Sequence, residues 1–561
     1  MTKGLRGRLR ANLAAQLIVR SFRRWQRRPR WSHVRGTPLT PALGARQRVL
    51  VATSIGGHLT GMTLESALAA ALVLRGAEVE TLLCDSALPA CLECTVLRLG
   101  DGREMADHGP RRLLCPGCFR SGAATYGELG LTVQKYSDWY TAEDRVRARD
   151  LATTTGYADL PSLRVDGVAV GEHALAGALR FFARADLSDE PRAESVFRRF
   201  VEAAALTAFA IDRLLASRHY DVVVFHHGIY VPQGLVGEVS RKRGVRVVNW
   251  NPAYRKNCFI FSHDDTYHHT LMDEPTSAWK DLPWDDAREK EIMDYLSSRW
   301  SGARDWIWFH DAPKEDLREI EQECGVDFSK PVIGLLTNVM WDAQLHYPAN
   351  AFTDMREWFL ETIRWFADRP DLQLLIRIHP AEIRGTVPSR QRVADEIAAA
   401  FPALPTNVFV IGPESNASTY VAMAHCDTVL IYGTKTGVEI TAMGIPVIVA
   451  GEAWIRGKGL TTDAHDRAGY LKILDSLPTG RRLDDATTAS ARKYAYHFFF
   501  RRMIPLGIVA PTGGDPVFRV VVDDLACLEE RADPGLDCIC DGVLTGSPFV
   551  YTARDVRTQT Q

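Results

Sequence analysis

Residues 47–85 read QRVLVATSIGGHLTGMTLESALAAALVLRGAEVETLLCD. The apolar run at the start predicts a buried strand, Gly56 and Gly57 predict a tight turn, and the longer run predicts a helix leading into a second strand. This order opens a Rossmann-like unit. The pattern G-x-G-x-x-G is absent, so the unit does not indicate a bound dinucleotide.

The same alternation of helix and strand continues along the first half of the chain. Residues 193–220 predict a long helix, and DVVVFHHGIY at 221–230 and RGVRVVNWN at 243–251 predict two further strands. Strands that alternate with helices favour a doubly wound parallel sheet. The first domain is therefore predicted to be a Rossmann-like α/β domain.

A second series of predicted strands begins near residue 330. Its strands are KPVIGLLTNV at 330–339, LQLLIRIHP at 372–380, NVFVIG at 407–412, DTVLIYG at 427–433 and IPVIVAG at 445–451. Predicted helices at 355–368, 417–426 and 436–444 lie between them. We expect an α/β fold with two Rossmann-like, doubly wound parallel-sheet domains that face a cleft.

The predicted domain boundaries follow from these two series. They are a basic arm at 1–45, a first domain at 46–300 with an insertion at 85–120, a helical connector at 301–328, a second domain at 329–475, C-terminal helices at 476–525 and a tail at 526–561. A chain of 561 residues with 46% hydrophobic and 24% charged residues is long enough for two cores.

The N-terminal segment is strongly basic although the net charge is only -2. Residues 1–36 carry eleven Lys and Arg, and no acid precedes Glu65. Leu5, Leu9 and Leu13 can share one helical face, a pattern typical of helices on anionic membranes. A loose basic arm and a nucleic-acid contact are the alternatives, but no nucleic-acid module follows. No secretory signal or membrane-spanning stretch is evident, so we expect a cytoplasmic protein with peripheral contact at the inner face of the membrane.

Four cysteines carry the clearest spacing signal of the first domain. Cys91-x2-Cys94 and Cys115-x2-Cys118 are separated by 20 residues. This spacing suits a tetrahedral metal held by four thiolates. A structural zinc is the main expectation, an iron-sulfur centre and disulfides are the alternatives, and a cytosolic setting disfavours disulfides.

The second domain places polar residues where predicted strands end. RIHPAEIRG at 377–385 puts Arg377, His379, Pro380 and Glu382 after one strand. A turn follows another strand, and its residues are Gly433, Thr434, Lys435, Thr436 and Gly437, with Glu439 soon after. The crevice beyond the carboxyl ends of parallel strands binds ligands in open α/β sheets. Backbone amides and hydroxyls at such a turn predict an anion site.

These motifs resemble those of a known family. IRIHPAE, the stretch from VIGPES to GKGLTTD, and ARKYAYHFFFRRMIP resemble bacterial capsule or surface polysaccharide biosynthesis proteins of the GT-B glycosyltransferase fold. The resemblance implies that His379, Pro380, Thr434, Thr436, Gly437 and Glu439 bind the nucleotide part of a sugar donor, and that the first domain binds the acceptor. Paired serines are common before the glycine in this family, whereas Lys435 here separates two threonines.

Sugar transfer places two demands on such a cleft. The leaving phosphate needs cationic groups, for which Arg377, His379, Lys435 and Lys458 are the candidates. The acceptor hydroxyl needs a base from the opposite domain. The candidate bases are His58, His226 and His227, with Glu65 and Asp85 behind them.

The sequence predicts a glycosyltransferase of surface polysaccharide synthesis that uses a nucleotide-sugar donor and a glycan or lipid-linked acceptor, without a catalytic metal. Two alternatives stay open. One is a nucleotide-sugar epimerase of the same fold, which needs no separate acceptor. The other is a non-catalytic, zinc-containing assembly partner in a polysaccharide complex.

Overall fold

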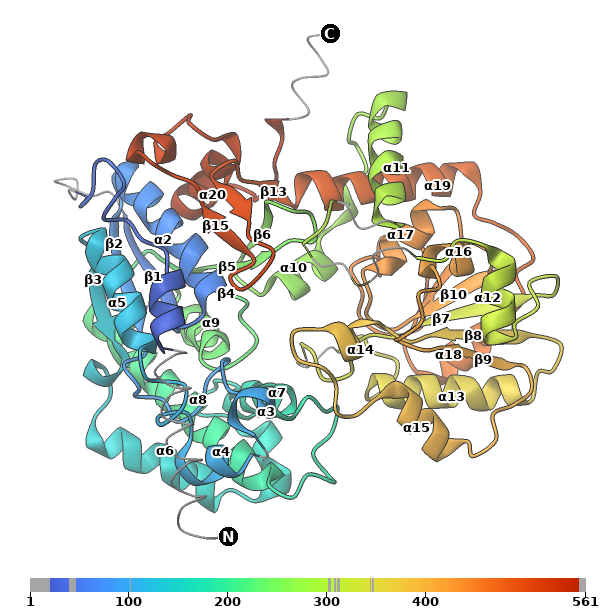
Figure 1. Ribbon diagram of the computed structural model, residues 1–561, viewed down its shortest axis with the longest axis horizontal. Helices are drawn as coiled ribbons and strands as arrows, with labels where there is room; N and C mark the ends of the chain where they lie inside the picture. The colour runs from blue at the N-terminus through green and yellow to red at the C-terminus, as the bar shows by residue number, and fades with distance from the viewer. Residues whose placement is uncertain are drawn as a thin grey trace.

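The computed structural model describes residues 21–39, 47–100, 102–300, 304–306, 309, 313–343, 345 and 348–553. Figure 1 shows two lobes side by side, each built around its own sheet. The described residues thus confirm the predicted α/β fold with two parallel-sheet domains.

The first sheet has the strand order β13-β6-β5-β4-β1-β2-β3. Its strands are β1 (Arg48–Ser54), β2 (Glu78–Leu83), β3 (Thr132–Lys135), β4 (Val222–His226), β5 (Arg246–Pro252), β6 (Cys258–His263) and β13 (Ile504–Pro505). Strands β5, β4, β1, β2 and β3 pair in parallel, whereas β6 and β13 run antiparallel at one edge. The sequence did not predict β3 or these two antiparallel strands.

Alternating side chains of the first sheet enter two different cores. Val49 and Val51 pack on one face with helix α2, while Leu50 and Ala52 pack on the other with helices α7 and α8. The helices of this domain are α2 (Leu59–Leu74), α3 (Val96–Leu99), α4 (Arg103–His108), α5 (Cys118–Glu128), α6 (Ala142–Thr154), α7 (Val170–Phe182), α8 (Ala193–Ser217) and α9 (Gln233–Lys242). Both faces are covered, as a parallel sheet requires.

The second sheet has the order β12-β11-β10-β7-β8-β9 and is parallel throughout. Its strands are β7 (Val332–Leu336), β8 (Gln373–Arg377), β9 (Val408–Ile411), β10 (Thr428–Ile431), β11 (Val447–Val449) and β12 (Thr462–Asp463). The first five coincide with the predicted apolar runs; β7, β8, β10 and β11 are buried on both faces, and the two central residues of β9 are half-buried.

Helices cover both faces of the second sheet as well. They are α13 (Met355–Ala367), α14 (Ala381–Arg384), α15 (Val393–Ala400), α16 (Thr419–Ala424), α17 (Thr436–Ala442) and α18 (Arg467–Leu474). Helices α10 (Tyr267–Asp273), α11 (Asp286–Trp300) and α12 (Leu317–Cys324) lie between the two series of strands along the chain. Helical structure in the connector therefore begins before the predicted boundary at 301.

The C-terminal segment returns to the first domain. Helix α19 (Asp485–Tyr496) continues into a π-helical turn (His497–Arg501), and strand β13 then pairs with β6 through Ile504 and Phe259. Strands β14 (Val509–Pro511) and β15 (Phe518–Val520) and helix α20 (Pro534–Thr545) follow. The prediction of helices throughout 476–525 was wrong after residue 501, since the chain there completes the edge and one face of the first sheet.

The described part of the basic arm packs on the first domain. Residues 21–27 are helical, and Arg24 donates to the carbonyl of Leu114 at 3.0 Å. Arg28 pairs with Glu128, and Trp31 is buried. Residues 21–39 are therefore part of the domain rather than a loose arm, and the predicted leucine face, which ends before residue 20, lies outside the described residues.

Candidate functional site

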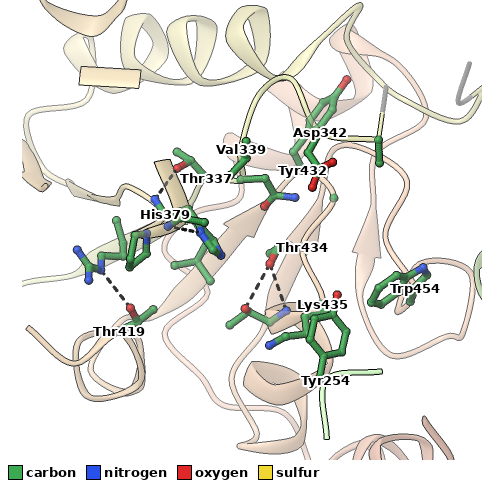
Figure 2. A pocket seen from close by; sticks show the side chains of 18 of the residues that line it. Tyr254, Thr337, Val339, Asp342, His379, Thr419, Tyr432, Thr434, Lys435 and Trp454 are labelled. Carbon is green, nitrogen blue, oxygen red and sulfur yellow. Dashed lines mark hydrogen bonds between the residues drawn. The ribbon is translucent and has the colours of Figure 1, made fainter. Parts of the chain in front are cut away.

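A pocket of about 440 Å³ lies between the carboxyl ends of the two sheets. Its wall in the second domain includes His379, Thr434 and Trp454, and its wall in the first includes His227. Figure 2 shows His379 and Trp454 on opposite sides of the pocket with Thr434 between them. The volume lies in the range of small-molecule binding sites.

His379 lines this pocket just after strand β8. Its Nδ1 accepts a hydrogen bond from the amide of Ala381 at 3.0 Å, and its own amide donates to Thr337 Oγ1 at 3.1 Å. Because Nδ1 is an acceptor, the neutral imidazole carries its proton on Nε2. Pro380, which forces the turn here, also lines the pocket. His379 thus has the tautomer that donates a hydrogen bond through Nε2.

Arg377 lines the pocket but holds the neighbouring loop. Its guanidinium donates to Thr419 Oγ1 at 3.1 Å and to the carbonyls of Gly412 and Ser415. Burial lowers its pKa to about 10, so it remains charged at neutral pH. The predicted phosphate contact is replaced in this structure by a clamp on residues 412–419.

Glu382, predicted as part of the donor site, does not line the pocket. Its side chain is buried and accepts the amide of Val393 at 3.0 Å. Burial raises its pKa to about 7. Glu382 therefore links helix α14 to helix α15. Its predicted role in the donor site is corrected, because α14 carries its side chain away from the pocket.

The turn after β10 presents hydroxyls to the pocket. Gly433, Thr434, Lys435 and Thr436 line it, and Thr434 Oγ1 lies 3.2 Å from Thr436 Oγ1. Gly437 lies underneath, where a Cβ would come within 2.5 Å of Ile431 Cδ1. Gly437 therefore lets α17 approach β10, and its predicted contact with donor is not seen in the lining.

Glu439 is occupied by protein partners rather than exposed to a ribose. Its carboxylate lies 2.6 Å from Lys435 Nζ and 3.2 Å from Arg299 Nε, and accepts from Tyr420. Burial alone would raise the pKa of Glu439, but Arg299 and Lys435 outweigh burial and hold it at about 2. The predicted ribose role of Glu439 is corrected to that of a buried counter-ion.

Lys458 was predicted to reach the donor phosphate from a glycine-flanked flap. The structure places its Nζ 2.8 Å from the carbonyl of Met272, with a second bond to the carbonyl of Glu274. It is buried and does not line the pocket. Lys458 instead links the 451–460 loop to the end of α10.

Of the three candidate bases, only His227 lines the pocket. It has φ +67°, a left-handed conformation that is costly for a residue with a side chain and is concentrated at functional sites. Burial lowers its pKa well below the usual value, so the ring is neutral. A neutral imidazole at the strand end can accept a proton from a ligand hydroxyl.

His226 and His58 lie behind His227. The His226 ring centroid is 5.5 Å from that of His227 and 5.0 Å from that of His58. His58 Nδ1 lies 3.3 Å from Glu93 Oε1. Glu65, buried beneath, accepts from Trp250 Nε1 at 3.0 Å, and burial raises its pKa to about 7. Asp85 bonds Ser137 away from the pocket.

The sequence reasoning missed several residues of the pocket wall. Tyr254, His268, Asn338, Asp342 and Trp454 all line it. Tyr254 and Asp342 lie far from the motifs along the chain. Trp454 lies four residues before Lys458, within the stretch from VIGPES to GKGLTTD, so an aromatic residue in that loop was the available signal.

The four cysteines lie in the first domain, where Cys94 is buried and Cys91, Cys115 and Cys118 are half-buried. The neighbouring Cys94 thiol and burial raise the pKa of Cys91. Burial raises the pKa of Cys115 to about 12, and the nearby Cys91 adds to this increase. Cys118 Sγ accepts the amide of Gly57 at 3.1 Å. Within the described ranges, however, no group of three or more His, Cys, Asp or Glu side chains is arranged to hold a metal ion.

No helix in the described part of the chain is both long and apolar enough to span a membrane.

Comparison with known proteins gives one family match. Residues 322–491 match a family model described as capsule polysaccharide biosynthesis protein. No curated protein matches the chain. This span includes the pocket residues from His379 to Trp454, but not His227.

Solved structures give similarities of low TM-score. A KpsC from Thermosulfurimonas dismutans, a beta Kdo 2,4 transferase, is 13% identical over 49% of this chain and 79% of that chain, with a TM-score of 0.33. A UDP-GlcNAc 2-epimerase from Neisseria meningitidis is 10% identical over 80% and 95%, with a TM-score of 0.24. These scores are too low to support a conclusion about activity. The family match over residues 322–491 confirms the resemblance of this chain to capsule polysaccharide biosynthesis proteins.

Proposed function

We propose that this protein is a glycosyltransferase of capsular or surface polysaccharide synthesis. It takes a sugar from a nucleotide-activated donor and passes it to a glycan or lipid-linked acceptor. The observation that carries the proposal is the pocket itself, which is lined both by His379, Thr434 and Thr436 of the second domain and by His227 of the first. The family match over 322–491 supports the same reading.

The two walls suit the two halves of the reaction. As the bond from the sugar to phosphate breaks, charge grows on the leaving phosphate, and His379 Nε2–H and the Thr434 and Thr436 hydroxyls are hydrogen-bond donors for it. As the new bond forms, the acceptor hydroxyl loses its proton, and the neutral His227 imidazole can take it. The His226 ring contacts His227 from behind, and the His58 ring contacts His226 in turn.

A nucleotide screen tests this proposal. Thermal unfolding is followed with CMP, CDP, UDP and GDP, because a ligand that binds only the folded state raises the melting temperature. We expect one nucleotide to stabilise the protein. If none does, the non-catalytic assembly role gains support and the transferase proposal is lost. Product formed from donor alone, with no acceptor, would instead identify an epimerase.

We also propose that Cys91, Cys94, Cys115 and Cys118 hold a structural zinc. The spacing of the four cysteines supports it, as does the proximity of Cys91 to Cys94, Cys115 and Cys118, and zinc would bind the four as thiolates. Four thiolates leave no open position, so the metal would brace the insertion and take no part in transfer. The alternative, an iron-sulfur centre, would give the purified protein a visible absorption.

Metal analysis checks the zinc proposal. We expect about one zinc per chain, and its loss in Cys91→Ser. Cys527→Ser is the matched control, because Cys527 is exposed and lies in the C-terminal segment. Protein purified under reducing conditions that carries no metal would end the proposal.

A further inference from the structure

Five aromatic rings form a wall at one end of the pocket, here called the aromatic end. The His268 centroid lies 4.2 Å from that of Tyr267 and 5.6 Å from that of Trp454, and Tyr254 lies 5.9 Å from Trp454. His227 completes the set at 6.3 Å from Tyr267. Figure 2 shows Tyr254 and Trp454 away from His379, with Thr434 between them and His379, so this wall adjoins the proposed phosphate contact at Thr434 and lies apart from the one at His379.

Polar atoms without partners lie in the same pocket. Among the described residues, Trp454 Nε1, His227 Nδ1 and Asn338 Oδ1 are buried and make no hydrogen bond. Trp454 is only 6% exposed. A buried donor or acceptor left unsatisfied is costly, and such groups are normally paired. A ligand that carries hydroxyls could satisfy all three, because a hydroxyl both donates and accepts.

The charges near the aromatic end are balanced or negative. Lys435 Nζ lies 4.8 Å from the Tyr254 ring, but it and Arg299 are paired with Glu439 and Asp305. Burial lowers the pKa of His268 to about 3 and lowers that of His227 well below its usual value, so both rings are neutral.

Two acids add negative charge to the lining. Glu452 lies two residues before Trp454, and Asp342 accepts from Tyr230 at 2.7 Å. Arg180 contacts the Tyr230 ring from outside the pocket and donates to the carbonyl of Leu92. A carboxylate in this end would therefore face Glu452 and Asp342 without an unengaged cation in the described lining.

We propose that the aromatic end binds a sugar ring that bears hydroxyls and no carboxylate. The ring belongs to the donor or to the acceptor, and its C–H face packs on the aromatic wall while its hydroxyls meet Trp454 Nε1, His227 Nδ1 and Asn338 Oδ1. This inference rests on the proposed function, because a nucleotide at the His379 end would place its sugar toward Thr434 and Trp454. It narrows the substrate class to uncharged sugars.

The test compares nucleotide sugars that differ only at C6. UDP-glucose and UDP-glucuronate are titrated by calorimetry beside UDP, and GDP-mannose and GDP-mannuronate beside GDP. The pair that counts is the one that carries the nucleotide this protein binds. In that pair we expect the neutral nucleotide sugar to bind about tenfold tighter than the nucleotide alone. The acidic member should gain nothing. Tighter binding of the acidic member would overturn the proposal.

Variants assign the gain to the wall. Trp454→Ala should abolish the tenfold gain and leave the dissociation constant of the bare nucleotide unchanged, and Trp454→Phe should keep most of the gain while losing the indole N–H. Trp365→Ala, on α13 outside the pocket, is the matched control. If Trp454→Ala weakens bare nucleotide equally, the wall stacks on the base and the proposal is wrong.

A second arm separates acceptor from donor. Methyl β-glucoside and methyl β-glucuronide are tested by saturation-transfer NMR with and without bound nucleotide. If the neutral glycoside binds and Trp454→Ala abolishes this binding, the aromatic end is a sugar site on the acceptor side. This measurement needs no bound nucleotide, so it remains informative if the transferase proposal fails. The proposal is lost if neither arm shows a neutral sugar that depends on Trp454.

Discussion

At the scale of single residues, the site divides into side chains that face the pocket and side chains that hold those in place. His379 and Thr434 line it, whereas the carboxylates of Glu439 and Glu382 are bonded to other groups of the protein. The sequence could predict that this strand edge is polar, because the motifs follow apolar runs directly. It could not predict that Arg299 would meet Glu439, since 139 residues separate the two along the chain.

His379→Ala should lower turnover by about 10²-fold or more, because the variant lacks the Nε2–H donor for the leaving phosphate. Nucleotide affinity should also fall, while the melting temperature stays close to that of the wild type. Steady-state kinetics, calorimetry and thermal unfolding on the same preparation check this.

His425→Ala is the control for that variant, because His425 contacts Phe328 and does not line the pocket. A destabilised His379→Ala protein that binds nucleotide normally per folded molecule would show His379 to be structural, with a role in holding the amide of Ala381.

Glu65→Gln should change how stability depends on pH. Burial raises the pKa of Glu65 in the folded protein to about 7. The protonated side chain therefore contributes to the free energy of unfolding below the pKa of the unfolded state, and this contribution is lost as the pH rises to about 7. Relative to wild type, the free energy of unfolding of the variant should gain roughly 3 kcal/mol between pH 4 and pH 8. Urea denaturation at several pH values measures it.

Glu128→Gln is the opposite control, since Arg28 and the amides of Trp31 and Ser32 overcome burial and lower the pKa of Glu128. It should lose stability relative to wild type as pH rises. If Glu65→Gln shows the same pH dependence as wild type, Glu65 is ionised at neutral pH in the folded protein.

At the scale of elements, the N-terminal segment has two parts with different roles. Residues 21–39 pack on the first domain through Arg24, Arg28 and Trp31. Removing the whole stretch 1–36 would therefore damage the fold and confuse any membrane assay. A deletion of residues 1–20 leaves these contacts and still removes Lys3, Arg6, Arg8, Arg10 and Arg20.

The protein without residues 1–20 should sediment less with anionic liposomes at low salt than the full chain, because it lacks five basic residues and the predicted leucine face. Neutral liposomes serve as the control, and added salt should weaken the binding of the full chain. Equal sedimentation of both proteins would show that these residues make no membrane contact.

Strands illustrate what patterns can and cannot predict. The runs at β7, β8 and β10 were found because they are apolar, short and bounded by turns. Strand β13 has two residues and exists only because β6 offers an edge, so no local pattern marks it. The same limit applies to the aromatic wall, which is assembled from both domains.

At the scale of the whole molecule, the chain passes between the domains twice. It leaves the first domain after β6 and returns before β13. The second passage brings Ile504, Phe518 and Leu536 onto a face of the first sheet that also holds Val49 and Val51. The first domain is therefore built from two segments of the chain and is incomplete without the second.

A chain that ends at residue 503 should aggregate, because it leaves the β6 edge open and the apolar face around Phe259 and Phe261 uncovered. We expect most of it in the insoluble fraction after expression, with recovery when residues 504–561 are co-expressed. Removing residues 554–561 alone is the control and should have little effect. A monodisperse chain ending at 503 would contradict this view.

Because β13 pairs with β6 so late in the chain, the first sheet is completed only near the end of synthesis. Strand β6 ends at His263 and β13 begins at Ile504, so 240 residues, 264–503, emerge between the two partners. At ribosomal rates of about 5–20 residues per second, the edge of β6 stays without its partner strand β13 for roughly 12–48 s. The nascent first domain must be shielded during that interval, and chaperone supply or codon speed across 264–503 then governs the yield of active protein.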